Sequence, residues 1–179
     1  MSPVVAVVVL AAGASTRFGS PKQRLLLEPV LERVRGARSA DDVLVVVGAH
    51  DVATNAPVVR CAEWERGPGA SLRCGLDALS PDTDAAVVVL ADGPDLHPEA
   101  IDRVVEAWRG GAGPIVAAAY GGARGHPVLL AREAWQTVPD QGGRLLRPVL
   151  VSCDDLGSPG DVDTPADLPG RLRPTEEEQ

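Results

Sequence analysis

Short aliphatic runs alternate along the chain with stretches whose apolar residues recur every three to four positions. The runs are continuous, as in strands buried on both faces of a parallel sheet, and the stretches between them are typical of helices with one buried face. The predicted strands are Val4–Leu10, Val43–Val47, Ala85–Leu90 and Pro114–Ala118, and the predicted helices are Pro29–Arg38, Ala70–Leu79 and Pro98–Arg109.

This alternation predicts a single α/β domain with a doubly wound, mostly parallel, Rossmann-like sheet. Ligands of such sheets bind at the carboxyl ends of the strands, so the loops after Leu10 and Leu90 are expected to carry the function. The domain is expected to span residues 1–170. Residues 171–179 (RLRPTEEEQ) have the polar and charged composition of a disordered tail.

Charge and composition argue against a nucleic-acid partner. The net charge is −8 at pH 7 and only 3% of the residues are aromatic, whereas nucleic acids are bound through many basic side chains and stacking rings. Cys61, Cys74 and Cys153 lack metal-ligand spacing and are expected to be reduced thiols. The N-terminal apolar run is too short to cross a membrane and has no signal-peptide architecture, so a cytoplasmic protein is expected.

The first candidate site is the small-residue loop after the first predicted strand. It reads LAAGASTRFGSPK from Leu10 to Lys22 and contains the cations Arg17 and Lys22. Small side chains let backbone N–H groups approach a triphosphate, and the cations can neutralise charge that builds up as pyrophosphate leaves. The loop is neither a Walker A sequence nor a GxGxxG fingerprint. Its plain alternative is a strand-to-helix turn with solvated cations.

Two acidic segments follow later in the chain. Asp92 comes directly after the predicted strand Ala85–Leu90 and precedes a Gly-Pro turn. A carboxylate there suits Mg²⁺, which commonly takes one or two carboxylates together with substrate phosphates, although Asp92 could also only cap the turn. In the second segment, GDVDTPADL, Thr164 and Pro165 are typical of a helix N-terminus.

The pattern LAAGxSxRxGxxK is the signature of the molybdenum-cofactor nucleotidyltransferase family, and the first loop matches every fixed position. Together with the acidic turn and the DVDTP segment, it makes residues 3–170 resemble the molybdopterin cytidylyltransferase-like group of the glycosyltransferase-A-type NTP transferases. The resemblance implies that Arg17 and Lys22 are catalytic and that Asp92 and Asp163 bind Mg²⁺, with Mn²⁺ as an alternative. The nucleotide-binding residues that it implies are Leu10, Ala11, Ala12, Gly13, Gly69, Ala70, Ser71 and Asp92.

Weaker similarities nominate further residues. The segment GPGASLRCGL resembles a base-contacting GxxxSLRxGL segment, although helix capping is its plain alternative. The loop GHPVL at Gly125 and the segment DQGGR at Asp140 resemble two acceptor-binding motifs, with Pro139 replacing the first glycine of the second. The resemblance therefore assigns Gly125, His126, Asp140 and Arg144 to the acceptor.

The resemblance implies transfer of a cytidylyl group from CTP to molybdopterin-bound molybdenum, with release of pyrophosphate and delivery of the product to a molybdoenzyme. The form LAAG, rather than LAGG, favours cytosine over guanine. The passages after Lys22 and after Ala131 are shorter than the family's usual ones. The alternatives are a nucleotidyltransferase for a sugar phosphate or another small phosphate, and a non-catalytic cofactor-binding or insertion partner on the same fold.

Overall fold

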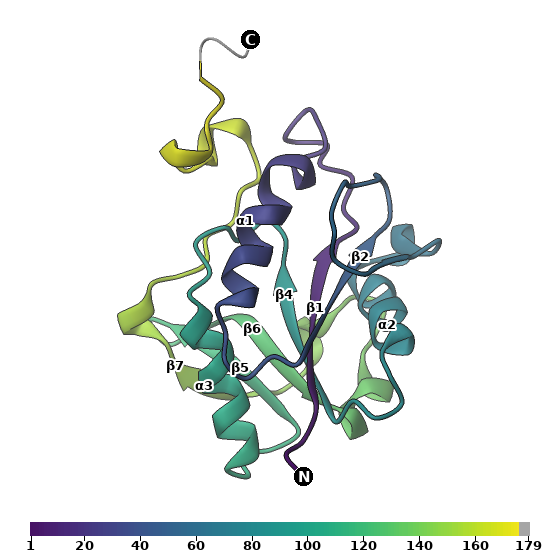
Figure 1. The fold of residues 1–179 in the computed structure, drawn as a ribbon, viewed down its shortest axis with the longest axis vertical. Helices are drawn as coiled ribbons and strands as arrows, with labels where there is room; N and C mark the ends of the chain where they lie inside the picture. The colour runs from purple at the N-terminus through teal and green to yellow at the C-terminus, as the bar shows by residue number, and fades with distance from the viewer. Residues whose placement is uncertain (176–179) are drawn as a thin grey trace.

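The computed structural model describes residues 1–175 and consists of a seven-stranded sheet with helices on both faces (Figure 1). The strands are β1 (Val5–Ala11), β2 (Asp42–Val47), β3 (Val58–Arg60), β4 (Ala85–Leu90), β5 (Ile115–Tyr120), β6 (Ala123–Ala131) and β7 (Val149–Ser152). The α-helices are α1 (Gln23–Arg35), α2 (Pro68–Ala78) and α3 (Pro98–Arg109). Short 3-10 helices occur at Trp64–Arg66, Arg132–Thr137, Gly143–Leu145, Asp154–Leu156, Pro165–Asp167 and Gly170–Leu172.

The predicted doubly wound, mostly parallel sheet is confirmed. The strand order is β3-β2-β1-β4-β6-β5-β7, and only β6 runs antiparallel to its neighbours. β1 pairs in parallel with β2 and with β4, and Leu10 lies opposite Val46 on one side and Leu90 on the other. The loops that follow β1 and β4 therefore leave the sheet side by side.

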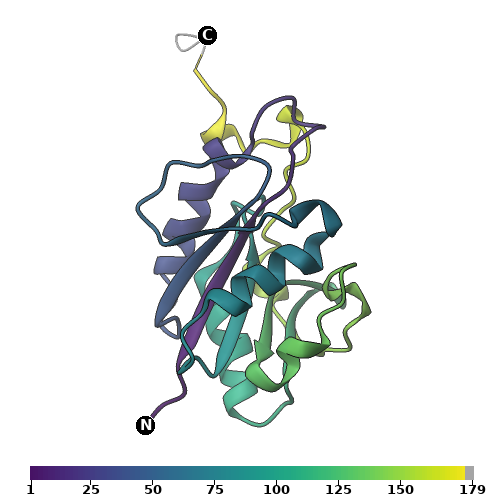
Figure 2. The same cartoon turned by 90° about the vertical axis from the view of Figure 1, so that its right-hand side faces the viewer.

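Two cores cover the two faces of the sheet, because alternate residues of each strand point to opposite sides. On one face, Val7 and Val9 pack with side chains of α1 and α3. On the other face, Val8 packs with Leu72 and Leu76 of α2. Figure 2 shows the sheet nearly edge-on between these two helical layers.

Helix α1 begins earlier than predicted. The structure starts it at Gln23, so that Pro29 lies inside the helix rather than at its first turn. Proline removes the hydrogen bond to the carbonyl group four residues earlier, here that of Leu25, which lies on the exposed side of the helix. Burial of Leu26, Val30 and the other apolar residues of this face outweighs that loss.

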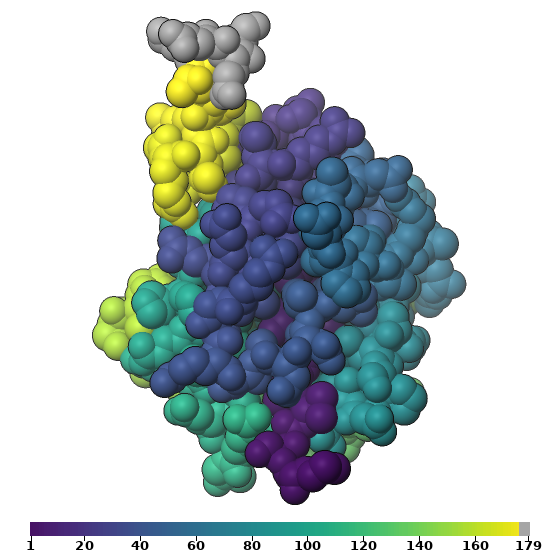
Figure 3. Space-filling model, in the orientation of Figure 1, coloured from purple at the N-terminus to yellow at the C-terminus, as the bar shows by residue number. Residues whose placement is uncertain are grey.

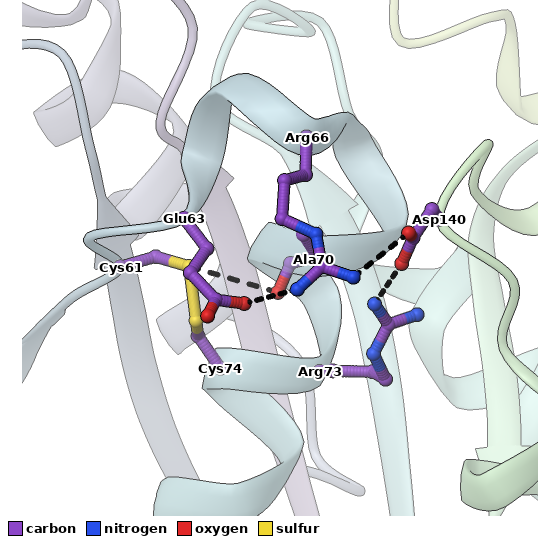
Figure 4. Close-up of a disulfide and its surroundings, with 7 residues drawn as sticks. All are labelled: Cys61, Glu63, Arg66, Ala70, Arg73, Cys74 and Asp140. Atoms are coloured by element: carbon purple, nitrogen blue, oxygen red, sulfur yellow. Dashed lines mark hydrogen bonds and ion pairs between the residues drawn. A yellow bond between two sulfur atoms is a disulfide. The ribbon is translucent and has the colours of Figure 1, made fainter.

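The prediction that all three cysteines are reduced thiols is wrong for two of them. Cys61 and Cys74 form a disulfide between the end of β3 and helix α2, with 5.7 Å between their Cα atoms (Figure 4). The two residues are 13 positions apart in the sequence, and only the packing of α2 beside β2 and β3 brings them together. Cys153 is buried and has no disulfide partner in residues 1–175.

The C-terminal segment returns to the end of the sheet at which β1 and β4 terminate (Figure 1). It packs there against the loop after β1 (Figure 3). The first residues of the expected disordered tail are held there: Arg171 lies in a 3-10 helix, and its guanidinium donates to Asp95 at 2.6 Å. Residues 176–179, the rest of that prediction, lie outside the described residues. No helix within residues 1–175 is long and apolar enough to cross a membrane.

Asp102 joins α3 to the turn after α1, and its removal is expected to destabilise the fold. Its buried carboxylate accepts hydrogen bonds from the backbone N–H groups of Arg38 and Ser39, both at 2.9 Å. Because Asp102→Ala leaves two N–H groups without an acceptor, we expect the free energy of unfolding to fall by about 2–3 kcal/mol in urea titrations. The control Glu106→Ala, on the exposed side of the same helix, should change it by less than about 0.5 kcal/mol. Equal effects of the two substitutions would contradict this role.

Candidate active site

The loop after β1 is held in shape by the buried amide of Gln23, the first residue of α1. Gln23 Nε2 donates to the Gly13 carbonyl oxygen at 2.7 Å, and Gln23 Oε1 accepts from the Ser15 hydroxyl group at 2.9 Å. Ser15 has a φ of 56°, which is uncommon for a residue with a side chain. From the other side, His50 Nε2 lies 2.8 Å from the Ala14 carbonyl oxygen, which can only accept. The loop is therefore fixed at three consecutive residues.

The same loop leaves a row of backbone donors unused. Within residues 1–175, the backbone N–H groups of residues 13–17 donate no hydrogen bond. Successive free N–H groups in a turn form an anion-binding concavity. Arg17 and Lys22 add two positive charges at the edge of this row.

The acids come from two other segments. Asp92 follows β4, and its backbone carbonyl accepts from Val162 N at 3.0 Å. This bond attaches the C-terminal segment beside the end of β4. Val162 is buried in a small apolar cluster with Phe18 and Leu26. Val162 is buried while Asp161 and Asp163 on either side of it are not, and both carboxylates lie close to that of Asp92.

Lys22 links the acids. Its ammonium lies 2.9 Å from Asp92 Oδ2 and 3.6 Å from Asp163 Oδ1, and it donates to the Val162 carbonyl oxygen at 2.6 Å. Arg17 binds the other oxygen of Asp163 at 2.7 Å. The structure thus brings together all four residues that the sequence assigned to catalysis and metal binding.

Asp161 joins this group, although the sequence analysis did not select it. One oxygen from each of Asp92, Asp161 and Asp163 lies within 4.8 Å of the others. Partial burial of its carboxyl group and the nearby charges of Asp92 and Asp163 raise the pKa of Asp161. The available signal was the spacing of two, which places two acids on one side of an extended segment.

The three acids fit a divalent cation. Asp92 Oδ1 is buried and has no hydrogen-bond partner within residues 1–175, and a buried carboxylate oxygen normally has one. Mg²⁺ and Mn²⁺ prefer such oxygen ligands. Asp92, Asp161 and Asp163 are therefore the residues that could hold the expected metal.

A cavity of about 310 Å³ surrounds these groups. Its walls include the predicted residues Leu10, Ala11, Gly13, Arg17, Lys22, Asp92 and Asp163, together with Gln23. Ala12 is not in its lining; the residue is almost completely buried, and its carbonyl accepts from Ala49 N at 3.1 Å.

A second cavity of about 420 Å³ adjoins the first, and Leu10 lines both. Its surface is mainly aliphatic and includes Leu72, Val88, Leu90, Val128, Leu130 and Leu146. The predicted acceptor residues Gly125, His126 and Arg144 line it, as does Arg124. Burial, assisted by the charge of Arg124, lowers the pKa of His126 to about 4, so its ring is neutral near pH 7.

Asp140 does not line either cavity. Its carboxylate pairs instead with Arg66 at 3.1 Å and with Arg73, and these contacts lower its pKa (Figure 4). The backbone is also engaged, because Asp140 O accepts from Gly69 N at 3.0 Å. A Cβ atom on Gly69 would overlap the Pro139 carbonyl oxygen, so this close approach requires glycine.

The same close packing at the start of α2 buries the predicted base-contacting residues. Gly69, Ala70 and Ser71 are buried at the start of α2 and do not line either cavity. Their neighbours Pro68 and Leu72 do line the second cavity. Contact of these three residues with a base stays a prediction.

Known proteins resemble the chain in sequence and in fold. Over 122 residues it is 37% identical to the bifunctional protein GlmU of Cutibacterium acnes, and the aligned region covers 59% of this chain and 29% of GlmU. It is 33% identical over 119 residues to the 3-deoxy-manno-octulosonate cytidylyltransferase of Anaeromyxobacter sp., which covers 60% of this chain and 48% of that enzyme. The chain thus spans less than a third of one relative and about half of the other.

The solved structures extend the likeness to the whole domain. Rv0371c of Mycobacterium tuberculosis H37Rv superposes with a TM-score of 0.75 at 29% identity, over 97% of this chain and 99% of that one. A complex of Rv0371c with manganese has a TM-score of 0.62 at 26% identity, over 83% of this chain and 89% of that one. The model of the MobA-like NTP transferase domain matches residues 7–153, and the chain belongs to that family.

Proposed function

We propose that this protein transfers a nucleoside monophosphate from an NTP, preferably CTP, to the phosphate group of molybdopterin or its molybdenum-bound form, and releases pyrophosphate. One arrangement carries the proposal: two cations, the carboxylates of Asp92 and Asp163 and a row of free N–H groups line one cavity, which adjoins a second. The carboxylate of Asp161 lies beside those two acids. The first cavity would hold the triphosphate and the second the acceptor.

The charges suit the departure of pyrophosphate. The free N–H groups of residues 13–17 would hold the β- and γ-phosphates, and Arg17 and Lys22 would neutralise charge as it develops on the leaving group. Groups that are already positioned need little reorganisation in the transition state, which is where they lower the barrier.

The three acids would hold Mg²⁺ or Mn²⁺, which when bound polarises phosphoryl oxygens and offsets their charge. The protein's own residues then have to align the reactants. The acceptor phosphate is already an anion, so its oxygen can attack the α-phosphorus in line without a general base. A pKa of about 4 makes His126 a weak base near pH 7, which favours a role in positioning over one in proton transfer.

The second cavity favours an acceptor with a weakly polar body and an anionic group. Its lining within the described residues contains Arg124 and Arg144 but no carboxylate, because Asp140 is paired elsewhere. A sugar phosphate offers several hydroxyl groups, which binding sites usually match with carboxylates or amides. Here the side chains that can accept hydrogen bonds are Gln141 and His126.

The competing acceptor is a sugar phosphate or a sugar acid, and one relative is named for a sugar acid, 3-deoxy-manno-octulosonate. A non-catalytic role is disfavoured because Arg17, Lys22, Asp92 and Asp163 are intact and converge. The proposal is tested by measuring pyrophosphate release with each NTP and Mg²⁺. Four reactions are compared: one with molybdopterin, one with N-acetylglucosamine 1-phosphate, one with 3-deoxy-manno-octulosonate and one without acceptor. Release that depends on molybdopterin supports the proposal, and release that depends only on a sugar acceptor overturns it.

The acid cluster generates one prediction. Asp92→Asn and Asp163→Asn keep the shape of the side chain but remove its charge, so each should lower metal-dependent transfer at least about a hundredfold. Asp161→Asn should have a smaller effect because Asp161 is the most exposed of the three acids. The matched control Asp95→Asn, in the same loop as Asp92 but paired with Arg171, should remain within about threefold of the native rate. Near-normal transfer by Asp92→Asn would rule out this metal site.

The anchor of the β1 loop generates a second prediction. Gln23→Leu retains the buried volume but removes the hydrogen bonds to Gly13 and Ser15, so the row of N–H groups should lose its alignment. We expect NTP affinity, measured by calorimetry with Mg²⁺, to fall about tenfold. Glu32→Leu, on the exposed side of the same helix, is the control. An unchanged affinity in Gln23→Leu would mean that the loop keeps its shape without the amide.

The base preference generates a third prediction. CTP should bind at least about tenfold more tightly than GTP, because a site that pairs with one base edge leaves groups unpaired when it meets another base. Ala12→Gly should reduce the difference in affinity between CTP and GTP, since the LAGG form is the one associated with guanine. Calorimetric titration of both nucleotides measures this difference. A preference of the native protein for GTP would refute the cytidylyl assignment while leaving nucleotidyl transfer intact.

A further inference from the structure

The side chain of Lys22 does more than line the cavity. Its ammonium is surrounded by three oxygen atoms, from Asp92, Asp163 and the Val162 carbonyl group, at 2.6 to 3.6 Å. Only 14% of this side chain is exposed, so the contacts are partly shielded from water. Two of the three oxygens belong to acids that a divalent cation would need.

The choice of residue at this position is distinctive. The chain has 17 basic residues, and Lys22 is its only lysine. A guanidinium group is planar and binds oxygens through a fixed fork, whereas an ammonium is a compact point charge that can exchange one set of oxygen ligands for another. Within residues 1–175, Lys22 is the basic residue whose charge pairs with two carboxylates of the acid cluster, those of Asp92 and Asp163.

We propose that Lys22 acts as an internal counter-cation of Asp92 and Asp163, one that keeps out a free divalent cation and yields to it only when a triphosphate arrives to take the ammonium. The inference rests on the proposed function for the identity of the triphosphate. A dication between these acids would lie within a few ångströms of the ammonium, and their repulsion there weakens binding at least about tenfold even in water. A triphosphate removes this penalty by giving the ammonium other oxygens.

The arrangement couples the binding of metal and nucleotide. A metal ion alone, or a triphosphate alone, has to break the ion pairs of Lys22 with Asp92 and Asp163. When both bind, the metal ion neutralises the two carboxylates and the triphosphate neutralises the ammonium. By linkage, the metal must then strengthen nucleotide binding by the same factor by which the nucleotide strengthens metal binding. The residue would thus select the metal-nucleotide complex over free metal.

The test is direct binding of Mn²⁺ to nucleotide-free protein, measured by the loss of the electron paramagnetic resonance signal of free Mn²⁺. Lys22→Met removes the charge and keeps the apolar stem, so it should bind Mn²⁺ at least about tenfold more tightly than the native protein. Arg24→Met removes the same charge from an exposed position on α1 and should remain within about twofold of native. If Lys22→Met binds Mn²⁺ no more tightly than native protein, the proposal is wrong.

A second measurement uses the native chain and does not depend on the folding of a variant. Lysine labelled with ¹³C at Cε gives one resonance because Lys22 is the only lysine. Saturating CTP with Mg²⁺ should shift it, whereas the same Mg²⁺ concentration alone should leave it in place. If Mg²⁺ alone shifted the resonance as far as CTP with Mg²⁺ does, the proposed exchange of Lys22 between the acids and the triphosphate would be wrong.

Asp92→Asn separates this failure from failure of the proposed function. Loss of Mn²⁺ binding in Asp92→Asn, with no gain in Lys22→Met, would overturn only the role of Lys22. If Lys22→Met binds Mn²⁺ more tightly and the added substitution Asp92→Asn leaves that binding unaffected, the acid cluster is not the metal site, and both proposals fail.

Discussion

The parallel register of β1 with β4 is the constraint on which the site depends. Leu10 lies opposite Leu90, and the Ala91 N–H group donates to the Leu10 carbonyl oxygen at 3.0 Å. The small-residue loop and the acidic turn therefore leave the sheet at the same height and next to each other. A shift of two residues in this pairing would move Asp92 by about 7 Å relative to the loop and separate Lys22 from its partner.

The C-terminal segment completes the site through apolar burial. Val162 packs with Phe18 and Leu26, so a small hydrophobic cluster sets the position of two carboxylates. Without nearby cations, the carboxylates of this segment would repel one another and that of Asp92. Arg17 and Lys22 supply the opposing charge, and the loop, the turn and the segment are consequently held together by the same ion pairs that the chemistry would use.

Much of this arrangement could be predicted because it depends on local sequence. The strand Ala85–Leu90 and the helix Pro98–Arg109 have the predicted bounds, since each combines strong periodicity with a clear boundary. Arg17, Lys22 and Asp92 lie in segments that follow the ends of β1 and β4, and the fold fixes where those ends meet. Asp163 was assigned through the family resemblance of the DVDTP segment. The early start of α1 was missed because Pro29 indicates a first turn locally, although burial of a whole helix face decides the matter.

What could not be predicted depends on contacts between distant segments. The pairing of Cys61 with Cys74 follows from the packing of α2 on the sheet. Asp140 faces Arg66 and Arg73 across a long sequence separation, which nothing in its own motif indicates. The free Asp92 oxygen and the role of Gln23 are likewise matters of three-dimensional bonding.

The central claim is that the α-phosphorus of the nucleotide passes to the acceptor, and labelled CTP tests it most directly. With Mg²⁺ and molybdopterin, the protein should transfer ³²P from the α position to the acceptor, and label from the γ position should appear only in pyrophosphate. Release of γ-labelled inorganic phosphate, with the α label remaining in CDP, would show that the protein is a nucleotide hydrolase and would contradict the account.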